Sequence, residues 1–167
     1  MADFEISLKK TLVNEGGYTL DPHETYRGID RKEWPGAAIW PIIDIRKTFP
    51  NFPKSLDSND QVNFLVSEFY RHCFWSKYFD QMPQELADKV FDRAVNAGAV
   101  TAIRLLQKAC GVTVDGIIGN QTMNAIAAQD PSTLVDRFKQ ESIAHYKAIV
   151  ATNPKDARFL DSWLRRC

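Results

Sequence analysis

A glutamate followed by two glycines is the short pattern in this sequence that most suggests chemistry. Apolar residues spaced four apart, Phe4, Leu8 and Leu12, predict a helix that starts near Asp3 and ends close to Glu15. The C-terminal end of a helix carries partial negative charge, which disfavours an ionised carboxylate there by roughly 0.3–1 kcal/mol. A protonated carboxyl group is what a general acid needs, so Glu15 is the first candidate catalytic residue. Local physics alone also fits an exposed glutamate at a helix end.

The residues after Glu15 predict a turn beside a polar loop. Gly16 and Gly17 predict the helix end, because glycine accepts the left-handed conformation found there, and they leave space for a ligand. The loop then offers groups that can position a water or a sugar: Asp21, His23, Glu24, Thr25 and Tyr26. Each alone also fits an ordinary turn or cap. The rings of Tyr18 and Tyr26 flank this loop and are candidates for stacking on sugar faces.

The elements that must position these groups are mainly helical. Residues 16–56 have no long apolar period and contain five prolines, so only short helical turns are expected there, for example Trp40 to Thr48. Apolar periods predict further helices after a capping box at Ser58 to Gln61, from Pro83 to Gly98, and over 102–109 up to Gly111. Later helices are predicted after Asn120 as N-cap, from Asp130-Pro131, and around Phe159 and Trp163. No run alternates convincingly as a strand, although 112–118 can pair briefly.

Composition narrows the function classes. The chain has 167 residues, with 21 Lys and Arg against 21 Asp and Glu, which argues against a nucleic-acid binder. Its apolar runs are too short for membrane insertion, and no secretory signal is visible, so synthesis in the cytoplasm is expected. Three cysteines fit reduced thiols, and no zinc-type or Cys-x-x-Cys pattern occurs, so neither a metal nor a cofactor is expected.

Several ordered motifs resemble one family. They are "NEGGY" and "ETYRGI" near the start, "WPIIDI", "LADKVFDRAVNAG" at 86–98, "AIRLLQKACGVTVDGIIGNQT" at 102–122 and "FLDSWLRR" near the end. Together they resemble glycoside hydrolase family 108, the lysozyme-like muramidases, with a C-terminal predicted peptidoglycan-binding region. The resemblance implies a lysozyme-like helical bundle with a long irregular active-site segment. It places the catalytic part at 1–98 and the helical C-terminal part at 99–167, packed together as one unit.

The resemblance also implies a reaction and a partner. Glu15 matches the family's catalytic glutamate, which would protonate the glycosidic oxygen of peptidoglycan as the bond breaks. The loop after Glu15 is shorter than the family pattern, and its usual acid-Gly-Gly segment is missing. Asp21 or Glu24 would have to supply a second carboxylate, with Thr25 beside them. The alternatives are a lytic transglycosylase with a single acid and a catalytically weak module that binds cell wall or protein.

The predicted helix from Pro83 to Gly98 carries two further candidates for substrate binding. Asp92 and Asn96 lie one helical turn apart on the same face, where they can contact a glycan or cover a helix surface. Peptidoglycan glycan strands are the expected partner. Because no export signal is visible, we expect the protein to act on the cell wall after release or export, through a holin or a secretion system.

Overall fold

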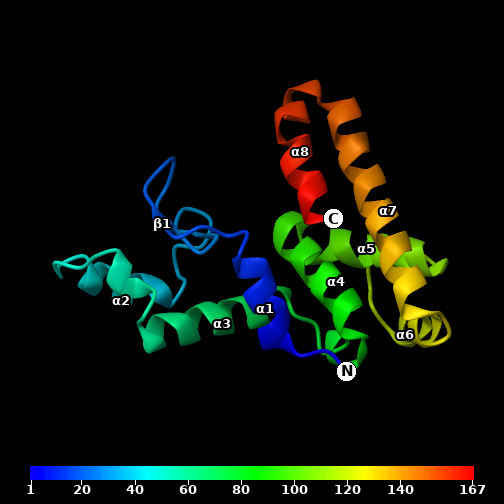
Figure 1. The fold of residues 1–167 in the computed structure, drawn as a ribbon, viewed down its shortest axis with the longest axis horizontal. Coiled ribbons are helices and arrows are strands. Elements are labelled where there is room, and N and C mark those ends of the chain that lie inside the picture. Colours follow the sequence, from blue (N-terminus) through cyan, green and yellow to red (C-terminus); the bar gives the residue numbers. More distant parts are fainter. The chain divides into compact units, whose positions relative to one another are not determined.

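The chain folds into two compact units. The computed structural model describes all of residues 1–167, and the units are Phe4–Trp75 and Ser76–Cys167, the latter together with Met1–Asp3. Figure 1 shows the helices of both units and the small strands of the first. The mainly α class predicted from the sequence is confirmed.

The first unit carries the opening motif between two helices. It contains α1 (Phe4–Leu12), the short strands β1 (Tyr18–Thr19), β2 (Thr25–Tyr26) and β3 (Ile29–Asp30), then α2 (Ile39–Arg46), a 3₁₀ turn at Lys54–Leu56 and α3 (Asp60–Phe74). The strands form one antiparallel sheet in the order β1-β2-β3. Tyr18 pairs with Tyr26, and Tyr26 pairs with Ile29. The sequence did not predict this sheet because each strand is only two residues long.

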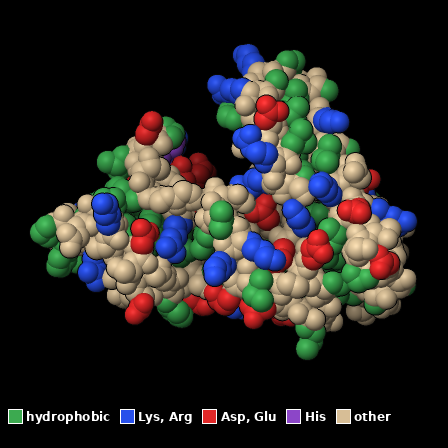
Figure 2. All heavy atoms as spheres, viewed as in Figure 1, with side chains coloured by type: hydrophobic (Ala, Val, Ile, Leu, Met, Phe, Trp, Pro, Cys, Tyr) green, Lys and Arg blue, Asp and Glu red, His purple; other side chains and the backbone are tan.

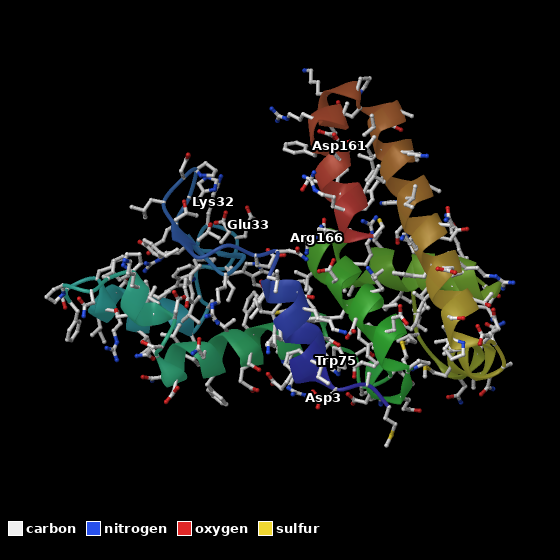
Figure 3. All side chains as sticks on the ribbon, in the orientation of Figure 1. Asp3, Lys32, Glu33, Trp75, Asp161 and Arg166 are labelled. Carbon is white, nitrogen blue, oxygen red and sulfur yellow. The ribbon has the colours of Figure 1, made fainter.

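The core of the first unit is formed by the facing sides of its helices. Phe4 and Leu8 of α1 are buried, as are the residues of α3 that recur every four positions, Val62, Val66 and Tyr70. Trp75, labelled in Figure 3, packs edge to face on Phe4 with ring centroids 5.2 Å apart. These contacts hold α1 against α3 from its first residue onward, and the candidate acid follows the opposite end of α1.

The second unit is helical throughout its regular structure. It contains a 3₁₀ turn at Phe79–Gln81, α4 (Gln84–Ala97), α5 (Ala99–Cys110), α6 (Asn120–Ala127), α7 (Pro131–Thr152), a 3₁₀ turn at Pro154–Asp156 and α8 (Ala157–Arg166). Helices α4, α5 and α7 contribute most of its core: Leu86, Val90, Phe91, Ala94, Ala102, Leu106, Leu134 and Phe138. Gly98 separates α4 from α5 with a φ of 86°, a value that L side chains rarely adopt.

Three local predictions are corrected by the structure. The N-cap of α3 is Asn59, whose side chain accepts from the Val62 amide at 2.9 Å, and not the serine of the predicted capping box. Asn120 is the first helical residue of α6 and not its cap. Residues 112–118 form no strand. Instead, the side chain of Gln107 accepts from the Gly116 amide at 2.8 Å and donates to the Ile117 carbonyl at 3.0 Å, which satisfies the loop backbone without strand pairing.

The predicted start of α7 is confirmed. Asp130 accepts from the Thr133 amide at 2.9 Å, and Pro131 follows as the first helical residue. On the face shown in Figure 2, Lys and Arg side chains are interspersed with Asp and Glu, as the balanced composition predicts. None of the helices combines the length and the apolar character needed to cross a membrane.

Candidate active site

Glu15 extends the last turn of α1. Its amide donates to the carbonyl of Leu12 at 3.2 Å, and its side chain is partly buried. Neither Gly16 nor Gly17 has a positive φ, so the predicted left-handed helix end is wrong. A β-carbon at either glycine would meet no atom within 4 Å. The two glycines therefore leave open space next to Glu15, as expected, but the backbone conformation does not require them.

A different glycine faces the carboxyl group of Glu15. Arg27 and Gly28 form the two-residue turn between β2 and β3, with φ values of 45° and 76°. Positive φ at both turn positions is what the tightest hairpins use, and at Arg27 it costs a non-glycine residue roughly 1–2 kcal/mol. A β-carbon on Gly28 would lie only 2.5 Å from Oε2 of Glu15, so the acid rests directly against this turn.

Tyr70 supports the same turn from α3. Its side chain is 1 % exposed, and its hydroxyl donates to the carbonyl of Arg27 at 2.7 Å. The hydroxyl oxygen also lies 2.6 Å from the place that a β-carbon of Gly28 would occupy. Sequence analysis missed Gly28 and Tyr70, because Tyr70 reads as one more apolar position of a buried helix face. The sequence offered one weak signal, the Arg-Gly pair. Glycine is common at the second position of a two-residue hairpin turn, but arginine is not typical of the first.

An open groove of about 580 Å³ lies beside the two glycines that follow Glu15. Its lining residues come from α1 and the segment after it, the hairpin turn, the segment before α3, and α3: Glu5, Leu8, Lys9, Leu12, Val13, Gly16, Gly17, Arg27, Asp57, Asn63 and Ser67. Nη1 of Arg27 donates to Asn63 at 3.0 Å, and its Nη2 lies 3.6 Å from Asp57. The groove thus combines apolar patches with amide, carboxylate and guanidinium groups, which suits a ligand with both hydroxyl groups and ring faces.

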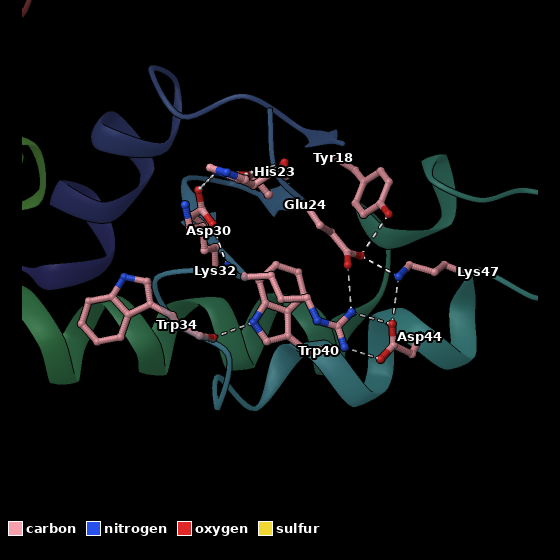
Figure 4. A network of polar contacts seen from close by, with 11 residues as sticks. Tyr18, His23, Glu24, Asp30, Lys32, Trp34, Trp40, Asp44 and Lys47 are labelled. Carbon is pink, nitrogen blue, oxygen red and sulfur yellow. Dashed lines mark hydrogen bonds and ion pairs between the residues drawn. The ribbon is translucent and has the colours of Figure 1, made fainter. Parts of the chain in front are cut away.

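Glu24 belongs to an ion cluster at the open end of the β2–β3 hairpin, away from the turn at Gly28 (Figure 4). It accepts hydrogen bonds from Tyr18 at 3.0 Å and Arg31 at 2.9 Å, and it pairs with Lys47 at 2.7 Å. Burial alone would raise the pKa of Glu24, but the bonds from Lys47, Arg31 and Tyr18 outweigh it and lower the pKa. An ionised, fully engaged carboxylate cannot donate a proton. This geometry favours a structural role for Glu24.

Asp44 of α2 closes the cluster. Arg31 binds it with two parallel hydrogen bonds of 2.7 Å each, and Lys47 adds a third at 2.9 Å. The hydrogen bond from Arg31 is the main cause that holds the pKa of Asp44 well below its usual range. Hydrogen bonds and ion pairs of the cluster therefore connect β1, the loop before β2, and α2 within the first unit.

The remaining polar loop residues mostly satisfy backbone or one another. Asp21 is exposed, and its amide donates to Thr19 at 3.1 Å. The hydroxyl of Thr25 donates to the carbonyl of His23 at 3.3 Å. His23 contacts Asp30, with Nδ1 and Oδ2 3.2 Å apart. Of the two carboxylates predicted to assist Glu15, Glu24 is engaged in the ion cluster, and Asp21 is exposed.

The two tyrosines expected to stack on sugars differ in exposure. Tyr26 is 1 % exposed, its hydroxyl donates to Asp57 at 3.2 Å, and burial raises its pKa to about 12. The stacking role predicted for Tyr26 is wrong, because its ring forms part of the core. Tyr18 is partly exposed and packs edge to face on Phe52, with ring centroids 4.6 Å apart. Tyr18 therefore keeps a face that a ligand can reach.

Asp92 and Asn96 lie on α4, in the second unit. Asp92 accepts from Nε and Nη2 of Arg166 at 3.2 and 3.0 Å. With its amide oxygen turned toward α8, Asn96 accepts from Nε of the same arginine at 3.1 Å. Figure 3 shows Arg166 at the C-terminal end of α8. Both residues thus hold the end of α8 against α4, and their predicted substrate contact stays a prediction.

No group of His, Cys, Asp and Glu side chains is arranged to hold a metal ion. The geometry instead brings together a carboxyl group at a helix end, a tight hairpin turn and an open groove. Glu15 itself does not line the groove, but the two glycines that follow it do, which makes its carboxyl group a candidate proton donor to a ligand bound there.

Comparisons with known proteins agree with this arrangement. Residues 8–98, more than half of the chain, match the family described as glycosyl hydrolase 108, and residues 101–167 match a predicted peptidoglycan domain. A search of curated proteins gave no significant match. The solved structure of Brucella abortus SagA is similar, with a TM-score of 0.64, 23 % sequence identity, and coverage of 98 % of this chain and 92 % of that one. This likeness confirms the lysozyme-like helical fold.

Proposed function

Because the chain belongs to glycosyl hydrolase family 108, we propose that it cleaves the glycan strand of peptidoglycan with Glu15 as the general acid. The match of 101–167 to a predicted peptidoglycan domain supports this choice of substrate. The observation that carries the proposal is the position of the Glu15 side chain. Its carboxyl group lies against the hairpin turn at Gly28, and the glycines that follow it line an open groove.

The reaction begins with a proton at the glycosidic oxygen. In glycosidases of this kind a carboxylic acid donates that proton as positive charge develops on the sugar ring. The turn at Arg27-Gly28 keeps the carboxyl from rotating freely. A proton donor that is already held in place loses less conformational entropy when the reactive geometry forms.

The ion cluster around Glu24 bears on the second half of the mechanism. Retaining and inverting glycosidases both use a second carboxylate, either as nucleophile or as base for water. Glu24 is neutralised by Arg31 and Lys47, and Asp21 is exposed on a turn. This favours a mechanism with one protein carboxylate, in which a group of the substrate assists. If the assisting group is the 6-hydroxyl of the sugar, the enzyme is a lytic transglycosylase and the product carries a 1,6-anhydro ring.

Product analysis distinguishes these outcomes. The purified protein is incubated with insoluble peptidoglycan, and the released fragments are analysed by mass spectrometry with and without borohydride reduction. We expect soluble muropeptides. Reducible ends indicate a muramidase, and 1,6-anhydro ends, which lack one water, indicate a transglycosylase. If a folded protein binds the wall but releases no fragment, the proposed activity is wrong and the chain is a binding module.

A further inference from the structure

Arg93 is a buried cation without a hydrogen-bond acceptor. It lies on α4 with 4 % of its surface exposed, and Nε, Nη1 and Nη2 all lack a partner. Its Cζ lies 3.8 Å from the ring centroid of Tyr146 on α7. The face of an aromatic ring attracts a guanidinium but carries no net negative charge. Tyr146, Cys167 and Asp92 favour the charged form of Arg93, but no carboxylate oxygen forms an ion pair or hydrogen bond with its guanidinium.

A second buried polar group lies in the same place. Ser142, one turn before Tyr146 on α7, is 3 % exposed, and its Oγ also lacks a hydrogen-bond partner. Arg93 and Ser142 line one small cavity of about 10 Å³. On this scale one water molecule needs roughly 10–15 Å³. We call this space the Arg93 cavity. Its other lining residues are Lys89, Asp92, Phe138, Lys139, Tyr146, Arg166 and Cys167.

The charges around the Arg93 cavity are unbalanced. Lys89, Lys139 and Arg166 join Arg93 in its lining, and Asp92 is the only carboxylate side chain among them. Asp92 already accepts two hydrogen bonds from Arg166. Burial lowers the pKa of Arg93, although the nearby Tyr146, Cys167 and Asp92 act in the opposite direction. Burying an unpaired charge costs several kcal/mol. A water molecule would offer lone pairs to Arg93 but would not neutralise it.

We propose that the Arg93 cavity binds a monatomic anion of the size of chloride, held by the guanidinium of Arg93 and the hydroxyl of Ser142. The size of the cavity excludes a whole phosphate or sulfate, and its charge selects an anion over water. The bound anion would link α4 to α7 beside the end of α8, so it would stabilise the second unit. This inference does not depend on the proposed glycosidase activity.

Thermal unfolding of the full-length protein tests the proposal. Sodium chloride or bromide replaces sodium gluconate at constant ionic strength, because gluconate is too large for the cavity. Binding to the folded state alone should raise the unfolding midpoint in a saturable way, by several degrees. Arg93→Met should abolish this response and should melt no lower than the wild type in gluconate, because it removes a buried unpaired charge. An unchanged midpoint in chloride and gluconate would overturn the proposal.

A matched control variant and a second measurement distinguish anion binding at Arg93 from a general effect of salt. Arg158 also stacks on an aromatic ring, with Cζ 4.5 Å from the centroid of Phe159, but it is exposed. Arg158→Met should keep the full chloride response, and Ser142→Ala should require more chloride for the same rise. Crystals grown in bromide should show an anomalous peak beside Arg93. If the peak is absent, or if acetate stabilises and halides do not, the cavity holds water or a carboxylate and the proposal is wrong.

Discussion

The carboxyl oxygen Oε2 of Glu15 and the hydroxyl oxygen of Tyr70 converge on one point over Gly28, at 2.5 and 2.6 Å from the place of its absent β-carbon. The same hydroxyl donates to the carbonyl of Arg27, the residue before Gly28. A single buried tyrosine on α3 thus holds the hairpin turn, and the turn holds the candidate acid.

Gly28→Ala should inactivate the enzyme by displacing Glu15. The new methyl group would overlap both oxygens, and the φ of 76° would strain the alanine by roughly 1–2 kcal/mol. Misplacing a catalytic group by about 1 Å can cost about 100-fold in rate, so we expect a loss of that order with a lower unfolding midpoint. Gly16→Ala is the matched control, because its β-carbon meets no atom within 4 Å. Equal activities of the two variants would contradict this account.

Tyr70→Phe should lower kcat more than it changes KM. The substitution leaves the partly buried carbonyl of Arg27 without this hydrogen bond, which costs roughly 1–3 kcal/mol of stability. The aromatic ring and the groove lining stay in place, so substrate binding should change little. Steady-state kinetics on soluble glycan fragments, with unfolding midpoints, measure both effects. A variant that loses stability but keeps the wild-type kcat would show that Tyr70 is only structural.

Glu24→Gln should affect stability rather than catalysis. Because the pKa of Glu24 is lowered in the folded state, its contribution to stability is present above the unfolded-state value of about 4.3 and is lost as the pH falls through the folded-state pKa. The variant should therefore be less stable than the wild type at pH 7, and the difference should shrink below about pH 4. Denaturant unfolding at several pH values measures this.

Activity of the same variant separates the two roles proposed for Glu24. If the ion cluster is structural, the folded fraction of Glu24→Gln should turn over at nearly the wild-type rate. Glu68→Gln, at an exposed position on α3, is the control for loss of a surface carboxylate. A large loss of turnover in folded Glu24→Gln alone would instead restore Glu24 as the second catalytic carboxylate.

Asp92→Asn should loosen the end of α8. The side chains of Asp92 and Arg166 are only 16 and 17 % exposed, so the loss of their ion pair should cost about 1–3 kcal/mol. KM for glycan should stay unchanged, since Arg166 already occupies the carboxylate. Asp136→Asn, at an exposed site on α7, is the control. If Asp92→Asn raises KM and leaves stability unchanged, the substrate-binding role first expected for Asp92 is correct.

The sequence predicted the helical elements well because their apolar residues recur at helical spacing. The buried positions Val62, Val66 and Tyr70 of α3 follow that period, and Asp130-Pro131 starts α7 as expected. The three-stranded sheet could not be predicted, because two-residue strands show no alternation. The role of Gln107 was also hidden, because its hydrogen bonds to residues 115–117 depend on tertiary packing.

The candidate site was predictable only in part. The motif around Glu15 marked it as the candidate acid, and its position after a helix end gave a physical reason to consider it. Its support by Gly28 and Tyr70 depends on a hairpin and a helix far apart in the sequence, which no local pattern reveals. Local patterns also could not show that the ring of Tyr26 is buried. Nor could they show that the carboxylate of Glu24 pairs with Arg31 and Lys47.

The most direct test of the account is Glu15→Gln. This substitution keeps the size and hydrogen-bonding shape of the side chain but removes the proton that the mechanism requires. The release of soluble fragments from peptidoglycan should fall by at least about 100-fold, because general acid catalysis contributes that much or more, while the unfolding midpoint stays close to that of the wild type. A folded Glu15→Gln protein that releases fragments at a substantial fraction of the wild-type rate would contradict the assignment of Glu15 as the acid.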